Sequence, residues 1–494
     1  MKIYPLSSRQ SVALASLVFA VALTGCSLAP EYERPASPVN ATWPASYTGE
    51  KIAADKTNLT VTADIGWRDF FRDSLLQELI TIALHNNRDL RKAALNVDAA
   101  QALYRIQRAE LLPNLNASGA LDVGRVPADV SAAQTTDINR RYDLSGATTA
   151  WELDLWGRIR SLDDQALARY MALDETRIAM KISLVSAVAG AYLTLRADQE
   201  LLQLTKKTLT SQQRSSELTR QLVRTGNATE LDLRMAEIAM RSAQVNLAAY
   251  TRQAIQDRNA LELLLGQSLT PELSRRLDDV VTLPEGIVPT TLPVGLPSEL
   301  LVRRPDIRSA EHQLRAANAN IGAARAAFFP AITLTGTAGT ASTSLDGLFE
   351  PGSGSWRFLP QITLPLFQGG ALLARLDIAH IQKRIEIASY EKTIQEAFRE
   401  VSDGLSGQRT LDDQLHAEQL SVIARQNAYD LVALRFREGE DDYLALLDTH
   451  RMLYGSQQAL VRTRLIQQMN IINLYKALGG GWSEDTVKVK SQIN

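Results

Sequence analysis

Cysteine is almost absent from this sequence, since its 494 residues contain only Cys26. A single cysteine cannot form a disulfide within the chain, which excludes a disulfide-stapled fold. The five histidines are scattered without the spacing of metal ligands. The sequence also has no G-x-S-x-G, P-loop or G-x-G-x-x-G motif. These absences argue against an enzyme, so we expect no catalytic residue, metal or soluble cofactor.

The first 25 residues have the layout of a secretory signal peptide. Lys2 and Arg9 precede an apolar run at 11–24, which is too short for a membrane-spanning helix. The tetrapeptide LTGC that ends at Cys26 resembles a bacterial lipobox. This resemblance implies cleavage before Cys26 and a covalent lipid on it, and Ser27 favours sorting to the outer membrane. An ordinary signal peptide followed by a chance cysteine is the alternative.

The mature chain would have 469 residues, with 51 basic and 55 acidic side chains. This balance does not indicate a nucleic-acid partner. No later segment is typical of a transmembrane helix. The apolar segment 182–195 is short and flanked by Lys181 and Arg196, and the segment 326–345 is interrupted by Pro330. A chain of this kind that crosses a membrane must do so with strands in a closed barrel.

The chain contains an internal repeat. The segment that begins at Arg88 resembles the one that begins at Pro305, at an offset of 217 residues. Three further pairs follow in the same order, at offsets of 211 to 213: 153–157 with 364–368, 224–233 with 437–446, and 263–267 with 476–480. These matches predict a duplicated unit of about 180 residues.

Proline is absent from 128–270 and 366–494, which permits very long helices there. The segments from Gly157 to Arg224 and from Gly370 to Arg437 each have room for a helix of roughly 100 Å. Apolar residues recur at spacings of three and four between charged ones, which favours coiled-coil-like packing. They are Leu184, Val188, Ala191, Leu195, Leu202 and Leu209 in the first run, and Ile378, Ile381, Ile385 and Ala388 in the second.

Each long run ends at a glycine, Gly226 or Gly439. A glycine suits the position just after a helix, and Thr229 can cap the helix that follows the first run. Acidic residues follow both glycines, as is common at helix N-termini. Each repeat is therefore predicted to contain a helical hairpin with its tip near 226 or 439.

Four segments alternate apolar and polar residues, namely 114–124 and 147–156 in the first repeat and 331–339 and 359–367 in the second. This alternation favours strands of a membrane barrel, although a soluble β-hairpin has the same period. We expect the segment 352–356, GSGSW, in a loop at an extracellular tip. Four strands cannot close a barrel, so the chain must associate, and three copies would supply twelve.

These patterns divide the chain into six predicted parts. They are a signal peptide (1–25), a lipid-anchored N-terminal segment (26–80), repeat 1 (81–267), an interrepeat linker (268–300), repeat 2 (301–480) and a C-terminal tail (481–494). The proline-rich segment 27–60 is expected to be extended. The polar tail from 482 onward is expected to be disordered.

The segments 295–336 and 473–482 (NLYKALGGGW) resemble the TolC-like outer-membrane factor family, and within it the OprM-like (NodT-type) efflux lipoproteins. The resemblance covers nearly the whole mature chain. It implies an α+β membrane protein that forms a homotrimer. In that trimer a 12-stranded outer-membrane β-barrel continues into a periplasmic α-helical tunnel.

The resemblance also implies the function of an exit duct in a tripartite efflux pump for drugs and toxic small molecules. The implied partners are a periplasmic adaptor (membrane fusion) protein, an inner-membrane resistance-nodulation-division transporter and outer-membrane lipids. The duct would be lipid-anchored in the outer membrane and extend into the periplasm. A duct for type I protein secretion or metal efflux is one alternative. A lipid-anchored periplasmic coiled-coil scaffold is an alternative of another class.

In this family the periplasmic end closes near the tips of the second hairpin, at a motif that reads G-x-D-x-Y-L-x-L-L-D-x-x-R. The matching residues are Gly439, Asp441, Tyr443, Leu444, Leu447, Asp448 and Arg451. By resemblance, Leu444 is the apolar constriction, Asp448 the acidic ring and Arg451 its tether. Asp448 and Arg451 are three residues apart, close enough on one helix to pair.

In the first repeat, Asp232 matches an acidic position of the family, whereas Met235 is the repeat equivalent of Asp448. An alternative role exists for Asp232, Asp441 and Asp442. All three can be ordinary acids at helix N-termini, where the helix dipole favours negative charge.

Overall fold

The computed structural model describes residues 27–40, 42–43, 62–129, 136–280, 282–290, 292 and 297–486. The expected signal peptide 1–25 and Cys26 lie outside these residues. The chain divides into two compact units. Unit 1 contains residues up to Ala36, Asn96–Leu173 and Ser309–Tyr390, and unit 2 contains Ser37–Leu95, Asp174–Arg308 and the residues from Glu391. Each unit therefore combines equivalent parts of the two repeats.

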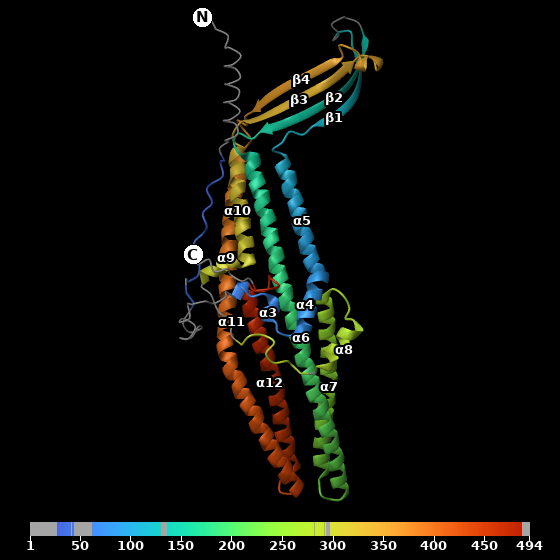
Figure 1. Ribbon diagram of the computed structural model, residues 1–494, viewed down its shortest axis with the longest axis vertical. Coiled ribbons are helices and arrows are strands. Elements are labelled where there is room, and N and C mark those ends of the chain that lie inside the picture. The colour runs from blue at the N-terminus through green and yellow to red at the C-terminus, as the bar shows by residue number, and fades with distance from the viewer. Residues whose placement is uncertain are drawn as a thin grey trace. The chain divides into compact units, whose positions relative to one another are not determined.

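The two proline-free runs form the two longest helices. Helix α6 spans Arg158–Arg224 (67 residues), and helix α11 spans Ala371–Glu438 (68 residues). Each turns back into a second helix, α7 (Glu230–Leu265) or α12 (Tyr443–Ala477) (Figure 1). The predicted long helical hairpins are confirmed.

The same order of elements occurs twice along the chain. The series α5, β1, β2, α6 and α7 is followed by the series α10, β3, β4, α11 and α12, which confirms the duplication. The shorter elements are η1 (Thr62–Asp64), α3 (Trp67–Phe70), α4 (Ser74–Asn86), α5 (Arg88–Ala109), α8 (Pro271–Asp279), α9 (Pro297–Arg303), α10 (Pro305–Ala326) and η2 (Asp346–Phe349).

The four strands of unit 1 form one antiparallel sheet in the order β1-β2-β3-β4 (Figure 1). The strands are β1 (Asn116–Val126), β2 (Asp137–Leu153), β3 (Ala331–Ser342) and β4 (Gly354–Thr363). The central pairing of β2 with β3 joins the two repeats, with Gly146 opposite Ala338. A bulge between Thr148 and Trp151 interrupts this register, and Ala150 there has a φ of 51°. Strands β1 and β4 form the two edges of the sheet.

The four strands were predicted, but several of their bounds were wrong. Strand β2 spans Asp137–Leu153 rather than 147–156, so it begins ten residues earlier than expected. Strand β4 begins at Gly354, so three of the five residues of the expected GSGSW loop lie in a strand. The same strand ends at Thr363 rather than 367. Pro365 follows and has no N–H to donate to a neighbouring strand, which explains the earlier end.

In unit 1, residues 27–34 form an extended segment on helix α10, which we call the N-terminal strap. The side chain of Asn318 donates to the carbonyl oxygen of Pro30 (2.8 Å), and Arg325 donates to that of Leu28 (3.2 Å). A Cβ added to Gly322 would lie 2.8 Å from Ala29, so glycine is required for this close approach. The extended conformation expected for this part of the chain is confirmed.

The core of unit 2 contains the C-terminal segment. The ring of Phe70 stacks on Tyr475 with the centroids 3.8 Å apart, and both residues are fully buried. The backbone N–H of Trp67 donates to the carbonyl of Ser483 (3.1 Å), and the indole of Trp482 donates to that of Ala63 (3.2 Å). The expectation that the tail is disordered from 482 onward is therefore wrong for 482–486.

The interrepeat linker also has more structure than expected, because it contains helix α8. Thr270 caps this helix by accepting from the N–H of Leu273 (3.3 Å), and Pro271 occupies its first turn. Proline is favourable there because the first turn has no intrahelical partner for an N–H.

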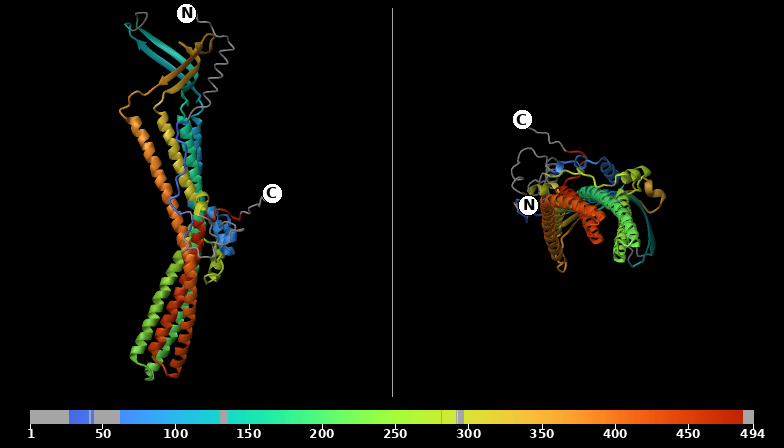
Figure 2. Two further views of the ribbon diagram at one scale, coloured as in Figure 1. Left: turned by 90° about the vertical axis from the view of Figure 1, so that its left-hand side faces the viewer. Right: turned by 90° about the horizontal axis from the view of Figure 1, so that it is seen from below.

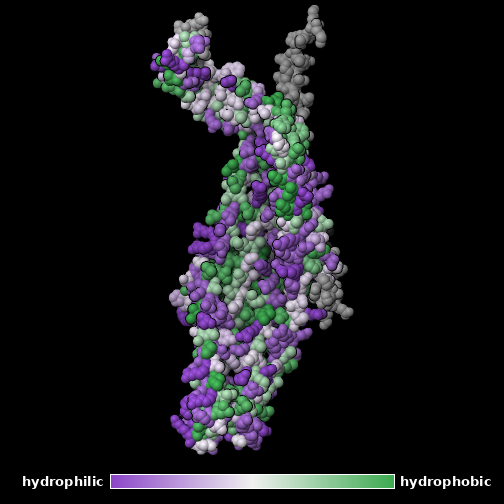
Figure 3. All heavy atoms as spheres, turned by 180° about the vertical axis from the view of Figure 1, so that it is seen from behind, coloured by the Kyte–Doolittle hydropathy of each residue, from purple (hydrophilic) through white to green (hydrophobic). Residues whose placement is uncertain are grey.

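The predicted apolar stripes of the two long helices differ in burial. Val188 and Leu195 of α6 are buried, whereas Ile378 and Ile385 of α11 are 63% and 50% exposed. An apolar window of α6 is long enough to cross a membrane by length and composition, but 56% of it is buried inside the protein. On the face shown in Figure 3, hydrophilic and hydrophobic residues are interspersed along the helices.

Candidate functional site at the helical hairpin tips

The tips of the two helical hairpins have the same backbone geometry. Gly226 and Gly439 both have a φ of 76°, a left-handed conformation that L side chains rarely adopt. The N–H of Asn227 donates to the carbonyl of Leu222 (2.8 Å), and the N–H of Glu440 donates to that of Arg435 (2.9 Å). Each tip is thus a Schellman motif, which satisfies the last carbonyl groups of the preceding helix. Figure 2 shows the two hairpins side by side with both tips at one end.

Three of the predicted acidic residues have local roles at these tips. Asp232 forms a capping box with Thr229, in which its Oδ2 accepts from the Thr229 N–H (2.9 Å). Asp442 caps helix α12 by accepting from the N–H of Ala445 (2.8 Å). Asp441 instead pairs with Arg435 across the turn, at 2.8 Å and 3.0 Å. Two of the three are therefore cap residues, as the helix-acid alternative proposed.

Tyr443 joins the two hairpins of unit 2. It is 6% exposed and packs in a cluster with Ala236 of α7 and with Leu447 one turn along α12. Its hydroxyl oxygen accepts a hydrogen bond from Ser215 of α6 (3.2 Å). Met235, the repeat equivalent of Asp448, packs against the same cluster. Near its tip, the second hairpin is therefore held on the first by an aromatic side chain.

Leu444, Asp448 and Arg451 form an exposed stripe on helix α12, which we call the gate stripe. Their spacing of four and three residues places them on one helix face, and Leu444 is 57% exposed. Among the described residues, neither Asp448 nor Arg451 has an ion-pair partner. The expected pairing between these two residues is therefore wrong for a single chain. Both side chains are exposed.

A second stripe of helix α12 faces α6 through three hydrogen bonds, which together we call the polar seam. They join Ser215 to Tyr443 (3.2 Å), Gln212 to His450 (2.9 Å) and Thr205 to Tyr454 (2.8 Å). Sequence reasoning missed this seam. The heptad-like spacing of 443, 450 and 454 is a signal that would have placed them on one face.

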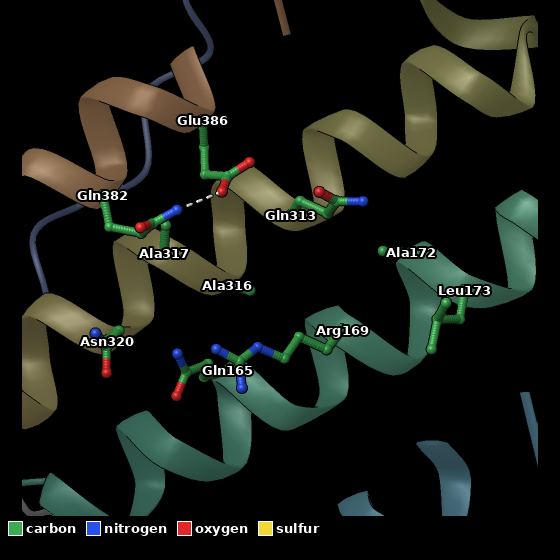
Figure 4. A pocket seen from close by; sticks show the side chains of 10 residues that line it. All are labelled: Gln165, Arg169, Ala172, Leu173, Gln313, Ala316, Ala317, Asn320, Gln382 and Glu386. Carbon is green, nitrogen blue, oxygen red and sulfur yellow. Dashed lines mark hydrogen bonds between the residues drawn. The ribbon is translucent and has the colours of Figure 1, made fainter. Parts of the chain in front are cut away.

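A groove of about 320 Å³ in unit 1 lies between helices α6, α10 and α11 (Figure 4). Its polar lining includes the amides of Gln165, Gln313, Asn320 and Gln382. Glu386 in this groove accepts a hydrogen bond from Gln382 (2.7 Å). These groups can solvate a polar solute, but they do not pair a nucleophile with a base. Across the part of the chain that the structure describes, no three His, Cys, Asp or Glu side chains are grouped to hold a metal ion.

Comparison with known proteins agrees with this architecture. The model of the family described as "Outer membrane efflux protein" matches residues 79–267 and 296–480. The toluene efflux pump outer membrane protein TtgF of Pseudomonas putida is 48% identical over 469 residues, 94% of this chain and 96% of that protein. The antibiotic efflux pump outer membrane protein ArpC of Pseudomonas putida is 47% identical over 482 residues, 97% and 98% of the two chains.

A solved structure shows the same fold. The open state of the outer membrane channel MtrE of Neisseria gonorrhoeae matches with a TM-score of 0.81 and 37% sequence identity. The match covers 94% of this chain and 100% of that one. The chain therefore belongs to the outer membrane efflux protein family, and it is an outer-membrane efflux channel that extends into the periplasm.

Proposed function

We propose that the chain is the exit duct of a tripartite efflux pump and acts as a homotrimer. The support for a trimer is the sheet of unit 1, whose edge strands β1 and β4 cannot remain unpaired in lipid. Three copies would supply twelve strands for a closed barrel. The lipid on Cys26 would add an anchor in the outer membrane.

The proposed cargo is small, toxic and largely apolar. TtgF is named for toluene efflux and ArpC for antibiotic efflux, and both are close to half identical to this chain. A periplasmic adaptor and a resistance-nodulation-division transporter are the proposed partners. A duct of this kind carries out no chemistry of its own, so it needs neither catalytic residues nor a resident cofactor.

The gate stripe is the observation that supports a closable duct. Leu444 and Asp448 are exposed on α12, and a neighbouring face of the same helix is held on the first hairpin by Tyr443. Three copies of Asp448 around one axis would repel one another as the pore narrows. Closure would then depend on pairing with Arg451 between copies. Such a closed state can be released by a partner that docks at the tips.

Cross-linking in intact cells tests the proposed partners. The chain would be purified through a C-terminal tag, and the proteins linked to it identified by mass spectrometry. A resistance-nodulation-division transporter with its adaptor is the expected result. An ATP-driven exporter would instead indicate protein secretion. Recovery of neither, with working cross-linker controls, would favour the scaffold alternative.

Conductance in planar bilayers tests the gate. We expect Leu444→Ala combined with Asp448→Ala to raise the conductance of the closed channel at neutral pH. Leu231→Ala is the matched control, because Leu231 is 70% exposed on the first hairpin and lies outside the gate stripe. Unchanged conductance in the double variant, with an intact heat-resistant oligomer, would refute the gate assignment.

A further inference from the structure

The buried side chains of helix α6 change character along its length. Nearer the N-terminus of α6, Val188 and Leu193 are both 0% exposed and apolar. From residue 205 onward, the buried side chains of α6 are polar, and they are Thr205, Gln212, Ser216 and Thr219. A hydrogen bond between side chains that exchanges for bonds to water has a net worth of only about 0.5–1.5 kcal/mol. The polar seam can therefore separate in water more easily than the buried apolar part of α6 can be exposed.

His450 is the one member of this seam that can change its charge near neutral pH. It is half-buried on α12, one residue before Arg451 of the gate stripe. Its Nδ1 lies 2.9 Å from Nε2 of Gln212, which is 6% exposed. With the amide nitrogen facing the ring, Gln212 can only donate, and this arrangement has a neutral ring with its proton on Nε2. A small cavity of about 40 Å³ lies beside the ring.

We propose that His450 and Gln212 position helix α12 against α6, and that a proton taken up by His450 releases α12 together with its gate stripe. A protonated imidazole carries hydrogen on both nitrogens, so it can no longer accept from Gln212. It also places a positive charge in a half-buried seam, where a charge without a partner is unfavourable. The inference rests on the proposed function of the gate stripe.

No charge of opposite sign faces the imidazole to offset this effect. Its neighbours are Gln212 of α6 and Tyr429 of α11, whose ring centroid is 5.2 Å away, with Tyr443 of its own helix at the same cavity. Both tyrosines are uncharged near neutral pH. On α12, Asp448 and Arg451 belong to the exposed gate stripe. In the described chain no ion pair reaches His450.

The direction of the pH effect follows from this environment. Burial lowers the pKa of His450 below its usual value of 6.5. Release of α12 would expose the ring and return its pKa toward that value. Acid therefore favours the released state, and the seam is intact above the usual pKa. The ring has one pKa in the seam and a higher one after release. For each unit by which these two pKa values differ, full protonation is expected to raise the ratio of released to attached α12 about tenfold.

Bilayer conductance measured from about pH 7.5 to about pH 5 tests the proposal on the full-length protein. Wild type is expected to conduct more as the pH falls. His450→Gln keeps an acceptor for Gln212 but cannot take up a proton, so its profile should be flat. His416→Gln is the matched control, because His416 is exposed on α11 and lies outside the seam. It should retain the rise of the wild type.

Gln212→Glu provides a second variant with an opposite expectation. A carboxylate at 212 would accept from the protonated ring and stabilise it in the seam. Acid should then hold α12 in place, and the rise in conductance should shrink or reverse. This variant keeps His450, so it decides the question even where His450→Gln fails to form a heat-resistant oligomer.

The outcomes separate this inference from the proposed function. If the Leu444→Ala and Asp448→Ala double variant does not open the channel, the gate itself is refuted. If that variant opens the channel but His450→Gln and Gln212→Glu both follow the wild-type pH profile, the role of His450 is refuted. A flat profile for His450→Gln with a reduced or reversed one for Gln212→Glu supports it.

Discussion

Arg34 and Glu311 form an ion pair that fastens the N-terminal strap to helix α10. The Arg34 guanidinium donates to both carboxylate oxygens of Glu311, from Nη2 to Oε2 at 2.8 Å and from Nη2 to Oε1 at 3.0 Å. The Glu311 side chain is only 6% exposed, and Arg315 donates to it at 2.8 Å. The pair therefore fastens the end of the strap at residue 34 to α10.

Glu311→Gln is expected to release the strap. The substitution removes the carboxylate charge that accepts the hydrogen bonds from Arg34 and Arg315 at a buried site, a local loss of about 1–3 kcal/mol. Limited proteolysis should then cut within residues 27–40 faster than in wild type. Arg141→Ala is the control, because Arg141 pairs with Asp143 on the exposed sheet and should leave cleavage unchanged. Equal cleavage of Glu311→Gln and wild type would mean that the ion pair does not hold the strap.

The same ion pair predicts that the strap detaches from helix α10 only in acid. Burial raises the pKa of Glu311, but the hydrogen bonds from Arg34 and Arg315 outweigh it, so the pKa lies below its usual value of 4.5. Because the pKa of Glu311 is lower with the strap attached, the ionised carboxylate stabilises the attached strap at pH values above the usual pKa. This stabilisation is lost as the pH falls through the lowered pKa of the folded protein. Proteolysis with an acid-tolerant protease should show release only below about pH 4. Release that begins near neutral pH would contradict this assignment.

Gly439→Ala is expected to destabilise the tip of the second hairpin. Nothing lies within 4 Å of a Cβ added there, so the effect comes from the backbone alone. A left-handed conformation costs an L residue roughly 1–2 kcal/mol. Hydrogen exchange over residues 436–444 should therefore be faster in this variant.

Gly455→Ala is the matched control for that variant. Gly455 is helical within α12 and also has open space around its Cα. Alanine is favoured over glycine in a helix interior by about 0.5–1 kcal/mol. Gly455→Ala should therefore slow exchange in α12. If both variants changed exchange in the same direction, backbone conformation would not be the cause.

Tyr443→Phe and Tyr443→Ala should separate the two roles of this side chain. Phenylalanine keeps the packing against Ala236 and Leu447 and loses only the hydrogen bond from Ser215, at about 0.5–1.5 kcal/mol. Alanine leaves a cavity as well, at about 3–5 kcal/mol. In bilayers, Tyr443→Ala should conduct far more than Tyr443→Phe. Equal conductance would mean that packing at this point does not hold the second hairpin.

The parts of this fold that could be predicted from sequence are those set by local rules. The absence of proline allows α6 and α11 to continue without interruption, and Gly226 and Gly439 mark the tips by their backbone freedom. The capping acids Asp232 and Asp442 follow from the helix dipole, and they were expected as one of two interpretations.

The parts that sequence did not predict depend on how distant segments align. Gln212 and His450 are 238 residues apart, and Arg34 and Glu311 are 277 apart. Which polar residue of α6 meets which residue of α12 is set by the packing of whole helices, not by either sequence alone. Asp448 and Arg451 show that favourable spacing along one helix is not enough to form an ion pair. Spacing permits that contact, but exposure to water removes most of its benefit.

Asp198 of α6 and Asp257 of α7 predict a pH-dependent stability of unit 2. Burial, a hydrogen bond to Asp257 and the charge of Asp257 raise the pKa of Asp198 to about 7, although Arg462 lowers it. The Oδ2 atom of Asp257 is buried without a partner, which is consistent with a shared proton. Because the pKa of Asp198 is raised in the folded protein, the protonated carboxyl group stabilises the fold in acid. This stabilisation is lost as the pH rises through about 7. Wild type should therefore have a lower melting temperature at about pH 8 than at about pH 5.

Asp198→Asn should flatten this dependence, because an amide donates to Asp257 at every pH. The control is Asp403→Asn, since Asp403 is exposed on α11 of the same unit and should retain the wild-type slope. Thermal melting of the detergent-solubilised protein, followed by circular dichroism at several pH values, provides the comparison. Melting curves of Asp198→Asn that shift with pH as much as those of wild type would show that the two carboxyl groups do not share a proton.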